Sequence, residues 1–151
     1  MASRRRAREF ALQALYQIDV SDCSARAALE ATWSWLLDGD DDTRPAESEE
    51  IEFTNKIVEG VVAQRDELDA LIEKASVNWR LSRMPIVDRN ILRMAAFELV
   101  ATPDVPVSVC INEAVELAKQ FGEKESRAFV NGILDRIAFE TGRGGRKHLG
   151  S

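Results

Sequence analysis

Arginine side chains crowd the first eight residues of the chain. Arg4, Arg5, Arg6 and Arg8 stand there with no acidic residue among them, so this end carries a local charge of +4. Guanidinium groups hold phosphates through two-pronged hydrogen bonds and stack on flat rings. The run therefore indicates a phosphate-binding end, while a solvated, frayed terminus, as in many soluble proteins, is the plainer explanation of the same residues.

Flat rings accompany basic residues at two places. Tyr16 follows the arginines, and Gln13 shares its predicted exposed helix face. In the C-terminal half a second group surrounds a glycine bend and consists of Lys119, Phe121, Lys124 and Arg127. Unstacked nucleobases pack on such rings at roughly 1–3 kcal/mol each, and single-stranded RNA fits this set of groups best. The alternative is packing, with Tyr16 half-buried and Phe121 closing a helix end in the core.

The sequence contains few residues suited to catalysis, metal binding or nucleotide binding. The one histidine, His148, stands in a glycine-rich tail, and Cys23 and Cys110 have no second cysteine two or three positions away. Nucleophilic triads, zinc sites and redox pairs are thereby disfavoured. The glycine-rich loops of nucleotide enzymes are missing, and Glu113 and Glu116 are spaced as on any solvated helix face. We expect a binding protein without catalysis, metal or cofactor, and with reduced thiols.

The composition is that of a soluble protein. The 151 residues are 45% hydrophobic and 30% charged, which suits one domain or two small packed halves. Apolar runs fall short of the ~20 residues of a membrane span, and the start lacks a secretory signal, so we expect a cytoplasmic protein. Residues 38–52 alone carry a net charge of −7, which leaves +1 for the rest of the chain. This acidic segment is typical of a solubilising linker, and the overall charge of −6 does not exclude a nucleic-acid partner.

Helical periodicity accounts for nearly all of the sequence. Helices are predicted over residues 3–20, 24–37, 48 to about 65, 68–75, 85–102, 112–120 and 124–141. Residues 104–111 alternate like a strand, but Pro106 removes a ladder donor and a partner strand is missing, so we predict a helix start there. The predicted fold class is all-α: two packed helical bundles of about seven helices, over about 3–65 and 66–141, with 142–151 as a disordered tail.

Burial follows from the same periodicity. The first helix is expected to bury Ala7, Ala11, Ala14, Leu15 and Ile18. The helix over 85–102 is expected to bury Ile91, Leu92, Ala95, Ala96 and Leu99, with Arg89, Arg93 and Glu98 outward. The last helix is expected to bury Phe129, Val130, Ile133, Leu134 and Ile137.

Four blocks of the chain resemble, in the same order, the bacterial NusB family of transcription antitermination factors. They are RRRARE with QALY (4–9 and 13–16), VDRNILRMA with FEL (87–95 and 97–99), DVP with INEAVELAK (104–106 and 111–119) and FVNGILD (129–135). The resemblance spans about residues 4–138. It implies one NusB-like domain over residues 1–141 and a helical 104–111 segment.

The resemblance also implies a function. NusB-like proteins bind the boxA element of nascent ribosomal RNA together with NusE, a small-subunit ribosomal protein; with RNA polymerase and other Nus factors they suppress Rho-dependent termination. Carried over by position, the RNA-binding residues are Arg4, Arg5, Arg6, Arg8, Gln13, Tyr16, Lys119, Phe121, Lys124, Glu125, Arg127, Phe129 and Asn131. Tyr16 and Asp88 match positions near the protein partner.

Two alternatives accompany this resemblance. Ribosomal RNA cytosine methyltransferases carry a NusB-like N-terminal domain, but a cofactor-binding domain does not follow here, so methyl transfer is not expected. Some family members form a homodimer that hides the arginine-rich surface, and the sequence does not choose between monomer and dimer.

Overall fold

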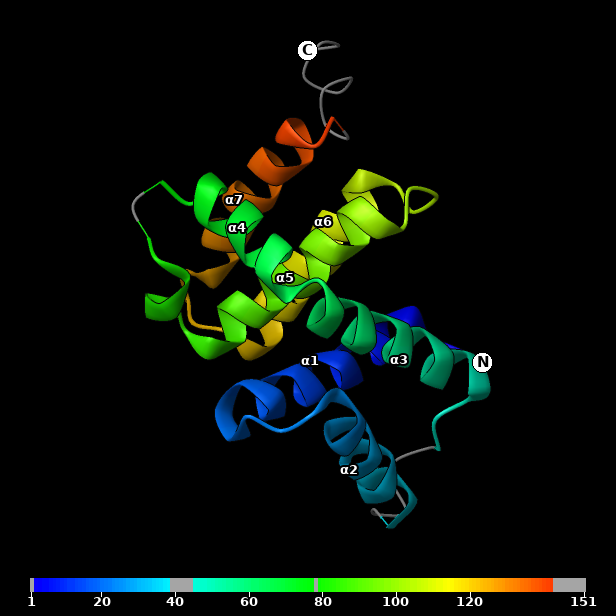
Figure 1. Ribbon diagram of the computed structural model, residues 1–151. Helices are drawn as coiled ribbons and strands as arrows, with labels where there is room; N and C mark the ends of the chain where they lie inside the picture. The colour runs from blue at the N-terminus through cyan, green and yellow to red at the C-terminus, as the bar shows by residue number, and fades with distance from the viewer. Residues whose placement is uncertain (1, 39–44, 78, 143–151) are drawn as a thin grey trace. The chain divides into compact units, whose positions relative to one another are not determined.

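The computed structural model describes residues 2–38, 45–77 and 79–142 (Figure 1). Within them the chain forms seven α-helices, a short 3-10 helix and no strand. The elements are α1 (Arg4–Ser21), α2 (Ala25–Asp38), α3 (Ser48–Ala63), α4 (Arg65–Ala75), η1 (Leu81–Arg83), α5 (Ile86–Ala101), α6 (Val107–Phe121) and α7 (Ser126–Glu140). The all-α prediction is confirmed, and the ambiguous 104–111 segment is helical from Val107 onward.

Some of the predictions concern residues that the structure does not describe. Residues 39–44 of the acidic segment, including Gly39, the predicted end of the second helix, and the tail beyond 142 lie outside the described residues. In the described part, no helix is long and apolar enough to cross a membrane. Cys23 and Cys110 form no disulfide with each other there.

The chain divides into two compact units, Met1–Ala63 and Gln64–Ser151. The first contains α1 to α3, and the second contains α4 to α7 with η1. The division falls at Gln64, the residue between α3 and α4, where the sequence predicts a helix break near Arg65.

In the first unit, α1 packs on both α2 and α3. Ser3 caps α1, since its Oγ accepts the Arg6 N–H at 3.1 Å, and every residue of the predicted α1 stripe is buried. Ser24 starts α2 in the same way, accepting the Ala27 N–H at 3.0 Å. The indole of Trp33 lies edge-on to Phe10, with ring centroids 5.5 Å apart, and thereby ties α2 to α1.

In the second unit, α5 is the central helix and contacts α4, α6 and α7 (Figure 1). Its predicted inward residues are all buried, but the prediction that Arg93 and Glu98 face outward is wrong, because they are only 4% and 2% exposed. Neighbours on several sides leave α5 almost no solvated face. Arg93 is accommodated because its guanidinium binds Asp69 of α4 at 2.8 and 3.2 Å and Asn90 at 3.0 Å.

The pair between Arg93 and Asp69 gives the first testable prediction. Asp69→Asn leaves a buried guanidinium without its counter-charge, so we expect a loss of about 3 kcal/mol in the free energy of unfolding. Arg65→Ala is the matched control, because it removes a longer ion pair to the same carboxylate, 3.9 Å and more exposed, and is expected to cost under about 1 kcal/mol. Urea unfolding followed by circular dichroism measures both, and equal losses would contradict the buried role of Arg93.

Candidate nucleic-acid interface

The carboxylate of Glu50 on α3 anchors the arginine-rich start of the chain. Glu50 is only 1% exposed. Its Oε2 accepts the Ser3 N–H at 2.9 Å, and its Oε1 accepts Arg6 Nη1 at 3.2 Å and the Glu47 N–H at 3.0 Å. One buried acid therefore joins the residue before α1, the first turn of α1 and the start of α3. By sequence Glu50 belongs to the acidic segment 38–52, and nothing in that run of acids marks it as the buried one.

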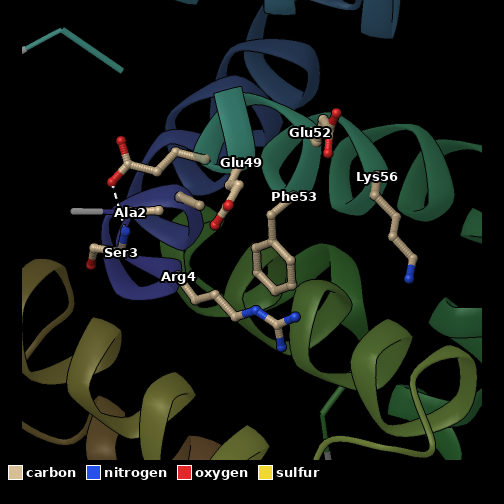
Figure 2. Close-up of a pocket in the computed structure, with 9 residues that line it drawn as sticks. Ala2, Ser3, Arg4, Glu49, Glu52, Phe53 and Lys56 are labelled. Atoms are coloured by element: carbon tan, nitrogen blue, oxygen red, sulfur yellow. Dashed lines mark hydrogen bonds between the residues drawn. The ribbon is translucent and has the colours of Figure 1, made fainter. Parts of the chain in front are cut away.

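Phe53, one helical turn after Glu50, contacts two further arginines. The guanidinium carbons of Arg4 and Arg8 lie 4.7 and 5.2 Å from the centroid of its ring. Figure 2 shows the Arg4 side chain extended beside the Phe53 ring. The cation–π contact orients the exposed guanidinium of Arg4, whereas Arg8 is buried against the same ring. A third residue, Thr54, donates its hydroxyl to the Ala7 carbonyl at 3.0 Å, so α3 holds the first two turns of α1 at several points.

Between these two helices lies an open pocket of about 540 Å³ (Figure 2). Arg4 and Phe53 line it together with Glu49, Glu52 and Lys56. With the buried Glu50, which also lines the pocket, three carboxylates stand against the two cations Arg4 and Lys56, and this excess of negative charge disfavours a phosphate inside the pocket. Phosphate contacts are therefore expected on the solvent side of the arginines.

The four arginines differ in exposure. Arg4 and Arg5 are exposed, Arg6 is partly buried on Glu50, and Arg8 is 4% exposed against Phe53. The sequence suggests four equivalent phosphate ligands, whereas the structure leaves two at the surface and uses two within the unit. The frayed-terminus explanation does not describe this segment, because a capped helix begins at Arg4.

Tyr16 and Gln13 are exposed further along α1. Tyr16 is 43% exposed, which is compatible both with the half-buried position and with a ring that is open to a ligand.

The predicted residues of the second unit gather around the bend between α6 and α7. Lys119 and Phe121 end α6, and Gly122 closes it by donating its N–H to the Ala118 carbonyl at 2.9 Å. Phe121 is 41% exposed, so the prediction that it closes the helix end in the core is wrong. Phe129 is half-buried, whereas the sequence predicts that it is buried. The other predicted residues at this bend are all exposed, and they are Lys124, Glu125, Arg127 and Asn131.

Asp88 and Ser126 fix this bend. Ser126 donates its hydroxyl to Asp88 Oδ1 at 2.8 Å and accepts the Glu123 N–H at 2.9 Å. A Cβ at Gly122 would lie 2.7 Å from Ser126 Oγ and 2.8 Å from a backbone oxygen, so the bend requires glycine. Asp88 is 4% exposed, and the structure therefore gives it an internal contact, whereas the sequence suggests one to a protein partner.

Burial raises the pKa of Asp88 above its ordinary 3.8, the hydrogen bond from Ser126 lowers it, and the nearby Glu123 charge raises it again.

The comparisons with known proteins agree with this architecture. The model of the NusB family matches residues 5–139. The transcription antitermination protein NusB of Myxococcus xanthus is 50% identical over 138 residues, 91% of this chain and 96% of that protein. The one of Geotalea uraniireducens is 49% identical and covers 91% and 95%.

Two solved structures extend the match to the fold. NusB of T. maritima superposes with a TM-score of 0.80 at 36% identity and covers 93% and 94% of the two chains. A chain from a structure of the antitermination factors NusB and NusE in complex with dsRNA superposes with a TM-score of 0.77 at 25% identity, covering 89% and 94%.

Fold and relatives together define an all-helical protein of the transcription antitermination class, which acts without catalysis. The matches cover nine tenths of the chain. It belongs to the NusB family, as the four blocks indicate.

The anchoring by Glu50 is testable through stability. Glu50→Ala removes the carboxylate that accepts two backbone N–H groups and pairs with the Arg6 guanidinium, so we expect the free energy of unfolding to fall by about 2–3 kcal/mol. Glu52→Ala, an exposed acid on the same helix, is the control and should change it by no more than about 0.5 kcal/mol. Chemical unfolding of both variants checks the difference, and similar values for the two would contradict the anchor.

Asp88 gives a prediction about pH. Because its pKa is raised in the folded chain, its contribution to stability declines as the pH rises from 3.8 through the folded value. Asp88→Asn keeps an oxygen acceptor for Ser126 but removes the charge, so its stability relative to the parent should be highest near neutral pH and decline as the pH falls toward 3.8.

Urea unfolding between pH 4 and 7 measures this difference, with the exposed Asp104→Asn as control. A relative stability of Asp88→Asn that increases as the pH falls has the wrong sign for this account.

Proposed function

We propose that the chain binds single-stranded boxA RNA of nascent ribosomal RNA together with NusE, and so suppresses Rho-dependent termination in the cytoplasm with RNA polymerase and other Nus factors. The observation that carries the proposal is the pair of exposed arginines, Arg4 and Arg5, at a helix start fixed by Glu50 and Phe53. The similarity to a chain from a structure of NusB and NusE in complex with dsRNA supports NusE and RNA as partners, while the single-stranded boxA element is the part that the experiment below tests.

In the first unit we assign phosphate contacts to Arg4 and Arg5. Both head groups are at the surface, and RNA phosphates accept charge-assisted hydrogen bonds from guanidinium groups. Arg6 pairs with Glu50 and Arg8 packs on Phe53, so these two arginines hold the start of α1 in place and add positive potential near the phosphate contacts. The exposed Tyr16 offers a ring for a base, and Gln13 offers an amide for hydrogen bonds.

In the second unit the α6–α7 bend carries the proposed contacts. Lys119, Lys124 and Arg127 are exposed cations for phosphates. The rings of Phe121 and Phe129 are placed for stacking. Asn131 and Glu125 supply polar groups that distinguish base edges, since an amide donates and accepts while a carboxylate accepts from exocyclic amines.

For NusE we propose Tyr16 as a contact, since it is exposed on α1. For Asp88, the other position near the protein partner, we propose a supporting role for the RNA contacts of the α6–α7 bend and no direct contact with NusE, because its carboxylate is buried and accepts the Ser126 hydroxyl.

The electrostatic part of the proposal is tested with a matched pair of double variants. Arg4→Ala with Arg5→Ala removes two proposed phosphate contacts, whereas Arg26→Ala with Arg65→Ala removes the same charge elsewhere. In filter binding with a short boxA-like RNA, with and without NusE, we expect the first variant to lose roughly tenfold or more in affinity. The slope of log affinity against log salt concentration should also be less steep than that of the parent by about 1.4, as expected for two lost phosphate contacts on a single strand.

Three results would count against the proposal: equal binding by the two double variants, no preference of the parent for boxA-like over scrambled RNA, or a salt dependence that does not change. Sedimentation of the parent with and without RNA tests homodimer masking, because a dimer that hides the arginines cannot persist when RNA is fully bound.

A further inference from the structure

An exposed tryptophan stands beside the predicted RNA-binding residues of α7 but is not one of them. Trp79, in the segment between α4 and η1, is 52% exposed. Its ring lies edge-on to the ring of Phe129, with centroids 6.1 Å apart and an angle of 76° between the planes. Val77, two residues earlier, is 70% exposed and lines the same pocket as Trp79 and Phe129, and apolar groups that gather at one place on a surface mark binding sites where a single exposed ring does not.

The backbone groups of Trp79 itself are hydrogen-bonded. Its N–H donates to the Ser76 carbonyl at 3.1 Å, and its own carbonyl accepts the Ser76 hydroxyl at 3.1 Å. Two residues later the Leu81 N–H donates to Glu73 Oε2 at 3.0 Å. Both polar groups of the Trp79 backbone thus have partners at the end of α4, which limits the directions in which the indole can lie.

Trp79 and Phe129 both line an open pocket of about 510 Å³ on the second unit. Gly132 lines it too, and a Cβ at that position would meet no atom within 4 Å. Arg136 lines the same pocket and is held by a hydrogen bond from its Nη1 to the Ala75 carbonyl at 3.2 Å. Among the described residues that line it, Arg136 is the only charged one, so the pocket combines flat apolar walls with a positive charge.

We propose that Trp79 and Phe129 form a nucleobase-stacking site that takes an unstacked base of the bound RNA, with Arg136 facing its polar edge or phosphate. This inference rests on the proposed function and extends its RNA contacts beyond the residues predicted from sequence. Aromatic rings stack on any base, and an arginine beside them complements the charge of the strand.

Two observations favour RNA over a protein partner here. Phe129 belongs both to this pocket and to the proposed RNA contacts of α7, where Arg127 and Asn131 are exposed nearby. Arg80, next to Trp79, adds a second exposed cation. The adjoining pocket at Phe139, a further large exposed ring, is lined by the carboxylates of Asp135 and Glu140 as well as by Lys74 and Arg136, so its charges balance and it offers a strand no comparable positive site.

The test compares RNA binding by the full chain and three variants. Trp79→Leu should weaken binding of a boxA-like single strand by roughly 5- to 100-fold, the loss of one stacked base, and Trp79→Phe should recover much of it. The slope of log affinity against log salt should not change, because stacking releases no counterions. Phe139→Leu is the control, because it removes another exposed ring, on the helix α7 that also carries Phe129. This variant should bind RNA like the parent.

Intrinsic fluorescence gives a second readout. RNA should quench the emission that is present in the parent and absent from Trp79→Leu, which isolates Trp79 from the other two tryptophans. If Trp79→Leu binds RNA as tightly as the parent and this emission does not change, the inference is overturned. If Trp79→Leu and Phe139→Leu both weaken NusE binding while RNA binding is intact, the surface binds protein and the inference is also overturned.

The proposed function can fail separately. Should the parent show no preference for boxA-like over scrambled RNA, that function is refuted, while quenching of Trp79 by any single strand still decides whether a base stacks there.

Discussion

The hydrogen bonds to the buried carboxylate of Glu50 hold the start of this chain in place. A run of arginines would ordinarily repel itself and move freely in water. Here one acid accepts from Ser3, Arg6 and Glu47, and the ring of Phe53 lies against Arg4 and Arg8. The cost of ordering long cationic side chains is thus met within the folded unit, before any ligand arrives.

In the second unit, too, buried polar side chains join pairs of helices. These contacts fix the positions of the side chains that face solvent. Arg93 ties α5 to α4 through Asp69, and Asp88 ties α5 to the start of α7 through Ser126. The α6–α7 bend, with its exposed lysines and rings, depends on the second of these contacts. In both units buried polar contacts hold a surface that is basic and aromatic, although the chain as a whole is acidic.

The sequence predicts the all-helical class and the apolar stripes because periodicity reports directly on which face is buried. It fails where a charged residue is buried with a partner distant in sequence. Arg93, Glu50 and Arg8 each look solvated by type, and only the packing of a second helix shows otherwise. The sequence does not identify Trp79 as a candidate site residue, for a different reason. A single tryptophan between helices has no periodicity to predict its exposure, and only the tertiary contact with Phe129 links it to the candidate interface.

Side-chain NMR of the arginine Nε–H groups tests the central claim most directly, because it follows each guanidinium separately as boxA-like RNA is added. If Glu50 and Phe53 hold two arginines inside and present two outside, the Nε–H signals of Arg4 and Arg5 shift and become protected from exchange only with RNA, while that of Arg8 is protected from the beginning. If instead Arg8 responds to RNA and Arg4 and Arg5 do not, the arrangement described here is not the one that binds RNA.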